Sequence, residues 1–418
     1  MKLRNTILLF PCLIGMINIS CQQRQGTKNL DNQVDSISKE FEMGTFGYDI
    51  KFLEKYDSII LLSNESGLGQ LAVSSKYQGK VFTSTAEGFE GQSFGWVNYK
   101  AFDAAIDPHM NAYGGEDRLW LGPEGGPFSL YFPKGKEMVF ENWKTPAAID
   151  TEPWDLRSSS SKEVQLIKKT QLTNYAGTIL DIQLDRTIKI LSNQEIEANL
   201  GISISDKVKS VGFNTLNSIT NIGEKPWDKI SGAPCLWNLD MFMPSDSTVI
   251  LIPYETEGAA KIATTDYFGE IEKDRISYKN GMLYFKADGK SRGKLGLVPS
   301  KAKEIAGSYD LSTGVLTVTK FSKDASKTYL NQEWTTKKDP FVGDAVNAYN
   351  DGPLADGGQM GPFYEIESVS PAAFLNPNEK LDHQHSVYHF VGDKEEVANI
   401  LKKLFNIQIS DIQSAFKK

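Results

Sequence analysis

Short runs of β-branched and aromatic residues, each closed by a turn residue, recur along most of this chain. They are SIILLSN, QLAVSSKY, KVFTSTAEG, FSLYFPKG, TIKILSN, STVILIPY, GMLYFKADG and VLTVTKF. Such runs predict β-strands, and the 35 glycines and 17 prolines supply the turns between them. Helical periodicity is confined to residues 46–56 and to a C-terminal stretch in which Val397, Ile400, Leu401 and Leu404 share one face. The sequence therefore predicts an all-β fold with short N-terminal and C-terminal helices.

The first 20 residues have the parts of a secretory signal peptide. Lys2 and Arg4 form a basic start, residues 7–19 are apolar, and Ser20 precedes Cys21. About 13 apolar residues cross too little of a ~30 Å hydrocarbon core to be a membrane helix. A small residue followed by Cys is what lipoprotein processing needs, because the sulfur takes a diacylglycerol before cleavage. We expect residues 1–20 to be removed and Cys21 to be lipidated; the alternative is an ordinary leader with a chance cysteine.

Residues 21–44 form a polar segment that cannot bury a core, so they predict a flexible tether behind the lipid. No acidic cluster follows Cys21, which favours a periplasm-facing membrane lipoprotein of the cell envelope. No repeat or low-complexity linker interrupts residues 45–418, which predicts a single domain. The formal charge is −8, and about −10 without the leader. So acidic a chain is a poor nucleic-acid binder, and the lipid is the one membrane contact that we expect.

The segment 107–128, DPHMNAYGGEDRLWLGPEGGPF, sets charged groups among glycines and aromatic residues. Its candidates for ligand binding or chemistry are His109, Glu116, Arg118 and Glu124. Glycines let the backbone approach a ligand closely, and charged groups on such turns can bind hydroxyls beside an aromatic plane. The alternative interpretation is a tight glycine-rich connection whose charges face water.

Two further sets of residues are candidates for binding. In 145–156, TPAAIDTEPWDL, Glu152 and Trp154 lie close together as in a sugar subsite, although a capped turn before a strand looks the same. Trp237, in APCLWNLD, and Arg292, in KSRGKLG, are candidates by residue type alone.

The segment 361–375, GPFYEIESVSPAAFL, places two carboxylates together if residues 363–368 form a strand. Period-2 alternation then puts Glu365 and Glu367 on one face, with Tyr364 and Ile366 on the other. Adjacent carboxylates raise each other's proton affinity, so one of them can serve as a general base near neutral pH. The alternative is a solvated face on which the two charges have no function.

Three of the four histidines lie in LDHQHSVYHF, residues 381–390. His383, His385 and His389 share strand parity and could point the same way. A metal site, contact with a ligand by one histidine, and a structural role are all compatible with this spacing. The chain has no GxxxxGK[ST], HExxH or CxxC motif, and we predict no metal and no cofactor.

Over residues 45–392 the chain resembles the galactose-mutarotase-like superfamily, in particular an uncharacterised lineage of Gram-negative lipoproteins with GGEDRLWLGPEGG. QLAVSSKYQGKVFTSTAEG resembles the opening strands, SITNIGEKPW a middle segment, and YEIESVSPAAFLNPNEKLDHQHSVYHF the closing strands. The resemblance implies a β-supersandwich with a sugar site in the concave face of one sheet.

In mutarotases a strand Glu removes the anomeric hydroxyl proton, a His protonates the ring oxygen, and an Arg and a second His hold the sugar. The resemblance makes Glu367 the first candidate for the base, since its distance to Pro371 fits the family's late strand. Glu365 is the reserve, and Arg118 is the candidate sugar-binding arginine.

The chain also departs from the mutarotase pattern. Glu124-Gly125-Gly126 stands where the family has HGG, and no histidine occurs between His109 and His383. His109 or His385 could act as the acid only if the fold brings one of them to Glu367. This departure puts ring-opening epimerisation in doubt.

The sequence thus predicts an exported lipoprotein that recognises a carbohydrate in a concave β-sheet cleft and acts on it as an epimerase-like enzyme. The alternatives are a non-catalytic carbohydrate-binding module of a glycan-degradation system and a glycosidase or lyase on the same scaffold. The predicted site consists of Glu367, Glu365, His109 and His385 for catalysis, and of Arg118, Glu116, Glu124, Trp154, Glu152, Trp237 and Arg292 for binding.

Overall fold

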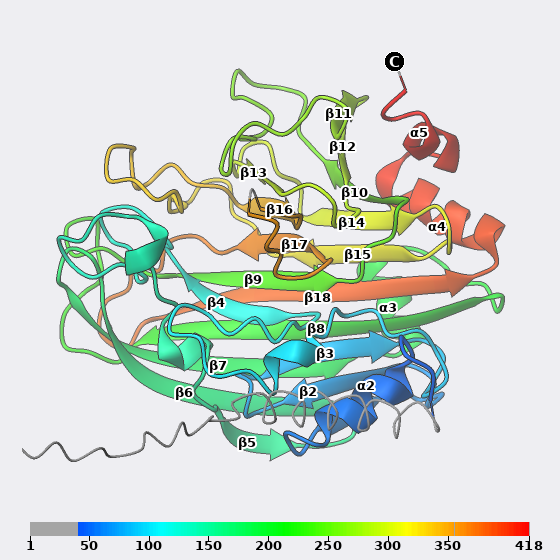
Figure 1. Cartoon of the computed structure of the whole chain (residues 1–418), viewed down its shortest axis with the longest axis horizontal. Helices are drawn as coiled ribbons and strands as arrows, with labels where there is room; N and C mark the ends of the chain where they lie inside the picture. Colours follow the sequence, from blue (N-terminus) through cyan, green and yellow to red (C-terminus); the bar gives the residue numbers. More distant parts are fainter. Residues whose placement is uncertain (1–40, 355, 418) are drawn as a thin grey trace, which may run out of the picture.

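The computed structural model describes residues 41–354 and 356–417 (Figure 1). The predicted leader, Cys21 and most of the predicted tether lie outside the described residues. Three antiparallel sheets of three, ten and five strands make up most of the regular secondary structure of the described chain, with a few short helices at their margins. The prediction of an all-β fold with short terminal helices is confirmed.

The ten-stranded sheet runs in the order β11-β12-β10-β14-β15-β18-β8-β7-β6-β5. Its strands are β5 (Asp155–Ser159), β6 (Glu163–Thr173), β7 (Ile179–Ile190), β8 (Val208–Asn221), β10 (Thr248–Pro253), β11 (Ile276–Lys279), β12 (Met282–Lys286), β14 (Ile305–Asp310), β15 (Leu316–Phe321) and β18 (Lys380–Gly392). Although β18 comes near the C-terminus, it lies in the middle of the sheet between β15 and β8 (Figure 1).

The five-stranded sheet runs in the order β13-β16-β17-β9-β4. Its strands are β4 (Arg118–Gly122), β9 (Cys235–Phe242), β13 (Gly293–Leu297), β16 (Val346–Asn350) and β17 (Tyr364–Val369). Strand β17 confirms the strand predicted for residues 363–368. Strand β9 separates β17 from β4, and Leu239 faces Glu367 on one side and Arg118 on the other.

The three-stranded sheet consists of β1 (Ile60–Ser63), β2 (Gln70–Ser74) and β3 (Lys80–Thr85). Helix α2 (Phe46–Leu53), predicted from its periodicity, begins where the Thr45 side chain accepts from the Tyr48 amide, and it packs on this sheet. A single bridge between Val81 and Asp117 links β3 to the residue before β4. The small sheet therefore abuts the five-stranded sheet at its β4 edge.

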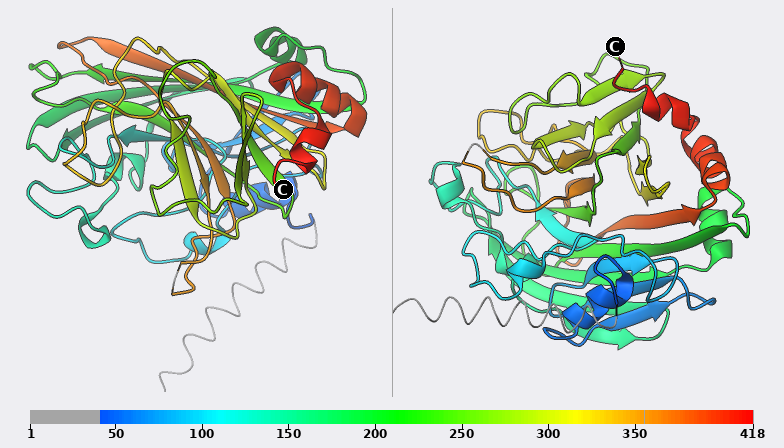
Figure 2. Two further views of the ribbon diagram at one scale, coloured as in Figure 1. Left: turned by 90° about the horizontal axis from the view of Figure 1, so that it is seen from above. Right: turned by 45° about the vertical axis from the view of Figure 1, so that its right-hand side comes forward.

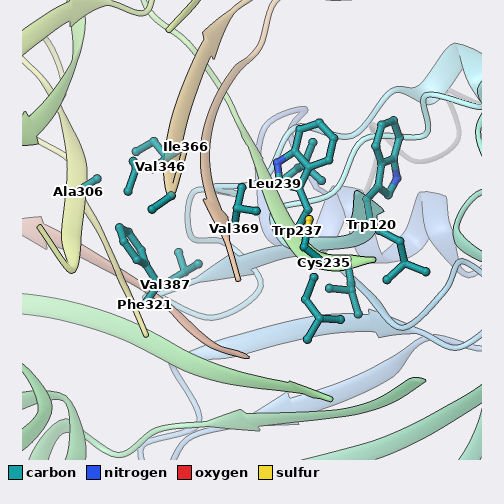
Figure 3. Packing of buried hydrophobic residues seen from close by; sticks show 14 of the residues in the cluster. Trp120, Cys235, Trp237, Leu239, Ala306, Phe321, Val346, Ile366, Val369 and Val387 are labelled. Carbon is teal, nitrogen blue, oxygen red and sulfur yellow. The ribbon is translucent and has the colours of Figure 1, made fainter. Parts of the chain in front are cut away.

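The main apolar core lies between the five-stranded and ten-stranded sheets. Val346 and Ile366 come from the first, Ala306 and Val387 from the second, and all four are fully buried (Figure 3). On the other face of the large sheet, α4 (Lys394–Phe405) buries Val397 and the apolar side that the sequence predicted (Figure 2). The short α5 (Ile409–Gln413) follows it.

Two elements differ from the sequence prediction. Residues 128–135 form turns rather than a strand, because the Ser129 hydroxyl accepts from the amides of Tyr131 and Phe132 and fixes a local turn. Helix α3 (Asn193–Leu200) was not predicted, since only Ile196 of this helix is buried and its apolar periodicity is weak. The described chain also has three 3-10 turns, at Tyr99–Ala101, Phe140–Asn142 and Ala147–Ile149. Within the described ranges, every helix is too short or too polar to cross a membrane.

Candidate functional site

Alternate side chains of all five strands of the five-stranded sheet form the floor of a cavity. Because successive side chains of a strand point to opposite faces, each strand contributes every second residue. The floor residues are Arg118 and Trp120 of β4, Trp237, Leu239 and Met241 of β9, Glu365 of β17, Tyr349 of β16 and Lys294 of β13. Figure 3 shows Trp120 and Trp237 side by side, and their rings meet edge to face at 5.8 Å.

The cavity has two chambers. The floor chamber lies on the sheet and has a volume of 160 Å³, and the loop chamber beside it has a volume of 640 Å³. The residues that line both are Glu124, Phe140, Phe268, Arg292, Lys294, Trp334, Tyr349 and Met360. Since they share so much of their lining, the two chambers are parts of one site.

Arg118 and Glu365 form a buried ion pair on the floor. The Arg118 guanidinium also lies over the Trp120 ring, 5.3 Å from its centre. Burial raises the pKa of Glu365 to about 8, with Arg118 opposing the rise and Glu367 adding to it. Arg118 Nε is buried and has no hydrogen-bond partner among the described residues. The pair therefore has a spare donor and a carboxyl group that exchanges its proton near neutral pH.

Glu367 lies beneath the floor rather than on it. Its Oε2 accepts from Trp237 Nε1 at 2.9 Å and from Lys294 Nζ at 3.2 Å. Its side chain is fully buried, and Oε1 has no partner among the described residues. Burial lowers the pKa of Lys294, but the surrounding carboxylates Glu367, Glu124 and Glu365 outweigh it, so the net shift is upward. Lys294 is thus held as a cation between the floor and Glu367.

Glu124 enters the cavity from a tight turn after β4. Its amide donates to the Gln332 side chain at 2.7 Å, and the Gly125 amide donates to the Gln332 carbonyl at 3.1 Å. A Cβ on Gly125 would lie 2.1 Å from the Glu333 carbonyl oxygen, so only glycine allows this approach. The turn thereby fixes the segment that carries Trp334. Burial raises the pKa of Glu124, and Lys294 opposes the rise.

The motif GGEDR divides its charges between the two faces of the sheet. Gly115 has φ +126°, and a Cβ there would lie 2.5 Å from Lys80 Cδ. Past this glycine, Arg118 faces the cavity, whereas Glu116 and Asp117 enter the space between the sheets. The sequence predicted Glu116 and Arg118 in one site, but the fold places them on opposite faces of the sheet.

A buried polar layer between the two larger sheets takes up these acids and the three histidines. Asp117 pairs with Arg186 of β7 at 2.9 Å, and both side chains are fully buried. His385 Nε2 lies 2.7 Å from Asp240 Oδ2, and His389 Nε2 lies 2.9 Å from Glu116 Oε1. The layer fastens the sheets to each other through charged hydrogen bonds.

One cluster of this layer has the composition of a metal site. Ligand atoms of Asp117, Asp240 and His385 lie within 4.8 Å of one another. Asp117 already bonds Arg186, however, and all three side chains are shut off from solvent. Burial raises the pKa of Asp240 to about 7, with His385 opposing the rise. The raised pKa values of Asp240 and His385 fit one proton shared between the two side chains.

The fold brings five predicted residues to the cavity and keeps the others away. Arg118, Glu124, Glu365, Trp237 and Arg292 line it. Besides Glu367, Glu116 and His385, already located, the residues outside the cavity lining are His109, Glu152 and Trp154, each with its own reason.

His109 stacks on the outside of Phe140, with ring centres 4.6 Å apart, and its Nδ1 lies 2.6 Å from the Trp143 carbonyl. Glu152 is exposed and pairs with Lys168 at 2.7 Å. Trp154 is buried and donates to the Ala148 carbonyl at 2.7 Å. Among the described residues, no histidine lines either chamber.

Most of the cavity wall was not predicted. Lys294, Tyr349, Phe268, Phe140 and Trp334 come from separate strands and loops. Each is an ordinary residue in its local sequence, and only the tertiary fold brings them together. The alternation of β13 and β16 was the one signal that could have found Lys294 and Tyr349. A further cavity of 470 Å³, between residues 322–328 and 371–382, shares no lining residue with this site.

The fold and the site define a mostly β protein with an aromatic-walled cavity on one antiparallel sheet. Within that class the chain belongs to a family of unknown function, DUF6786, whose model matches residues 44–416. No curated protein matches the chain.

Some of the solved structures that are similar to this chain carry the name that the sequence resemblance suggested. A galactose mutarotase-like protein from Lactobacillus casei ATCC 334 has 10% identity over 79% of this chain and 100% of its own, with a TM-score of 0.47. A protein from Synechocystis sp. PCC 6803 has 12% identity over 81% and 96%, with a TM-score of 0.47. A galactose mutarotase related enzyme from Lactobacillus acidophilus has 8% identity over 80% and 97%, with a TM-score of 0.40. Likenesses this distant say nothing of activity or substrate.

Proposed function

We propose that the chain binds a carbohydrate in the cavity formed by the floor chamber and the loop chamber. The observation that carries this proposal is the meeting of aromatic walls with buried ion pairs in one hollow. Trp334, Phe140 and Phe268 offer apolar surface to sugar rings, and the Arg118–Glu365 pair offers donors and acceptors to hydroxyl groups. Few other ligands present a ring face and a rim of hydroxyls together.

The raised pKa of Glu365 favours proton transfer as a second activity of the same site. In an epimerase-like reaction the Glu365 carboxylate would take the proton of the anomeric hydroxyl, while an acid gives a proton to the ring oxygen as the ring C–O bond breaks. Glu124 lines the same chamber, and burial raises its pKa as well. We propose Glu124 as the acid, in the place where mutarotases use a histidine. Ring closure from the open aldehyde would return both protons.

Thermal unfolding of the full chain in detergent, with and without single saccharides, tests the binding proposal. A ligand at about 100 times its Kd stabilises the folded state by about 2.7 kcal/mol. We expect at least one saccharide to raise the Tm, and Arg118→Ala to abolish the rise. Arg157→Ala, which removes a half-exposed arginine of β5, is the matched control and should retain it. A panel of mono- and oligosaccharides that leaves the Tm unchanged would overturn the proposal.

Anomeric exchange, followed by NMR on a saccharide that binds, separates binding from chemistry. If proton transfer takes place, Glu365→Gln abolishes exchange and leaves the saccharide bound. If exchange in the wild type never exceeds the rate in buffer, the site is a binding site without this reaction.

We also propose that the protein is a periplasm-facing lipoprotein, on the strength of the leader-like residues 1–20 and of Ser20-Cys21. Metabolic labelling with an alkyne fatty acid should mark the wild type, and Cys21→Ser should be unlabelled and recovered with soluble protein. Labelling of Cys21→Ser at the wild-type level would contradict the proposal.

A further inference from the structure

Arg292 differs from the other two cations of the cavity in having no acidic partner. Arg118 pairs with Glu365 and Lys294 pairs with Glu367. Arg292 makes no ion pair with a described residue, although it lines both chambers. Its charge is therefore available to a group that enters the cavity.

The Arg292 side chain is exposed, and two contacts orient its guanidinium. It lies on the Phe268 ring, 3.8 Å from the ring centre, and its Nε donates to the Tyr349 hydroxyl at 3.2 Å. Stacking holds the planar group in one orientation and lowers the entropy lost on binding. No described residue bonds the two terminal nitrogens, which together form the fork that matches a carboxylate or a sulfate.

Two acids of the loop-chamber wall have partners other than Arg292. Asp351 accepts from the Tyr349 hydroxyl at 2.8 Å and from the Gly361 amide at 3.1 Å. Glu333 pairs with Lys338 at 2.6 Å. The Tyr349 hydroxyl accepts from Arg292 and donates to Asp351. The tyrosine therefore orients the guanidinium, and the positive charge at the two terminal nitrogens is not neutralised by any described acid.

The loop chamber is large enough for more than one sugar ring. Its 640 Å³ falls within the roughly 300–1,000 Å³ of cavities that enclose ligands of several rings. The floor chamber, at 160 Å³, is open to it through shared walls. A ligand that fills both chambers would contact the Arg118–Glu365 pair and Arg292 together.

We propose that the cavity binds an acidic oligosaccharide, and that Arg292 pairs with a carboxylate or sulfate on one of its units. This inference rests on the proposed carbohydrate-binding function and specifies its substrate class. A uronate and a sulfated sugar present the same anionic fork to the guanidinium, so the chemistry is shared and the source is left to the experiment.

Calorimetric titration of the full chain in detergent with matched pairs of oligosaccharides tests the inference. One pair is tetragalacturonate and its fully methyl-esterified form, which removes the charge and keeps the chain. The other pair is a carrageenan tetrasaccharide and its desulfated form. We expect at least tenfold tighter binding of one acidic member than of its neutral partner.

Arg292→Gln should reduce that preference to about twofold, because it weakens binding of the acidic member far more than binding of the neutral member. Arg157→Gln is the control for an equal loss of charge outside the cavity, and it should keep the preference. Raising NaCl from 50 to 500 mM should weaken the acidic member alone, since exposed charges are screened. The Tm of Arg292→Gln without ligand should match that of the wild type.

The outcomes separate this inference from the function on which it rests. If neutral and acidic members bind equally well, or if Arg292→Gln retains the preference, the acidic class is wrong and carbohydrate binding stands. If no member of either pair binds but a neutral saccharide raises the Tm in the thermal screen, the acidic class is wrong; if neither experiment finds a ligand, both proposals fail. If only the uronate or only the sulfated member is preferred, the source of the charge is identified.

Discussion

Arg118 of β4 reaches across β9 to Glu365 of β17, and the two side chains form an ion pair above the strand that separates them. The two residues lie 247 positions apart in the sequence. Because both groups line the floor chamber, the charge state of Glu365 is set at the point where a ligand would arrive.

The raised pKa of Glu365 predicts a specific dependence of stability on pH. Burial, with help from Glu367 and against Arg118, raises this pKa from 4.5 to about 8. The folded state therefore holds a proton that the unfolded state has released between these pH values. Its contribution to stability is fully present below pH 4.5 and is lost as pH rises toward 8.

Glu365→Gln removes this titration, so its Tm relative to the wild type should rise steadily from pH 5 to pH 8. Calorimetric melts at four pH values measure the difference. Glu152→Gln, an exposed acid in a surface pair, should give a flat difference over the same range. Parallel curves for Glu365→Gln and the wild type would show that Glu365 is ionised throughout.

Removal of Arg186 should destabilise the protein strongly. Its side chain is fully buried and donates to Asp117, to the Gly79 carbonyl and to Asn217. Arg186→Met leaves the Asp117 carboxylate buried without its cation, which costs about 3–5 kcal/mol. Chemical denaturation measures the loss.

Arg157→Met breaks an ion pair to Asp185 that is half exposed, and it should cost at most about 1 kcal/mol. This variant is the control, since the same residue type is lost from the neighbouring part of the large sheet. Equal losses in the two variants would mean that the buried polar layer does not hold the sheets together.

Phe140 is expected to matter for binding and little for stability. It lines both chambers, yet 57% of its surface is exposed. Phe140→Ala should weaken binding of the saccharide found in the thermal screen about tenfold, as loss of an aromatic anchor does. Tyr278→Ala, an exposed aromatic on β11, should leave the affinity unchanged. An unchanged affinity in Phe140→Ala would remove Phe140 from the binding wall.

Gly125→Ala should displace part of the cavity wall. The new methyl group would meet the Glu333 carbonyl oxygen at 2.1 Å, so the segment that carries Trp334 must shift. Overpacking of this kind costs about 1–3 kcal/mol, and binding should weaken further because Trp334 moves. Tryptophan fluorescence and titration measure the two effects.

Gly135→Ala is the matched control for Gly125→Ala. No atom lies within 4 Å of its added carbon, and its φ of +73° alone sets the cost. It should lower the Tm modestly and leave binding intact. If both variants bind as the wild type does, the close approach at Gly125 has no part in shaping the cavity.

Strand parity was the most informative property of the sequence for this fold. It predicted that Glu365 and Glu367 share a face, and that the three histidines of residues 381–390 do as well. Parity does not tell which face meets the core, because burial on both faces makes β18 similar on either side. The histidines therefore proved to be structural, and Glu367 lies under Trp237 and Lys294 rather than in the open cavity.

Residues that meet only through long-range pairing could not be predicted. Lys294 Nζ lies 4.7 Å from the centre of the Trp237 ring because β13 and β9 belong to one sheet. Nothing in either local sequence indicates this contact. Trp154 illustrates the opposite limit. An acid and a tryptophan between prolines resemble a sugar subsite, but Trp154 bonds the Ala148 carbonyl and closes a turn instead. The residue type suggested sugar binding, but the buried Trp154 ring and its N–H serve the packing of the turn.

The central place of β18 has a consequence for how the chain is made. Until residues 380–392 have been synthesised, the other nine strands can exist only as two separate sheets, one ending at β15 and the other at β8. Each would present an unpaired edge, which is the form in which β proteins aggregate. The same late strand brings the histidines that meet Asp240 and Glu116. The large sheet is thus completed only when β18 pairs with both halves. A chain that stops short of residue 380 would keep two unpaired strand edges and would be prone to aggregate.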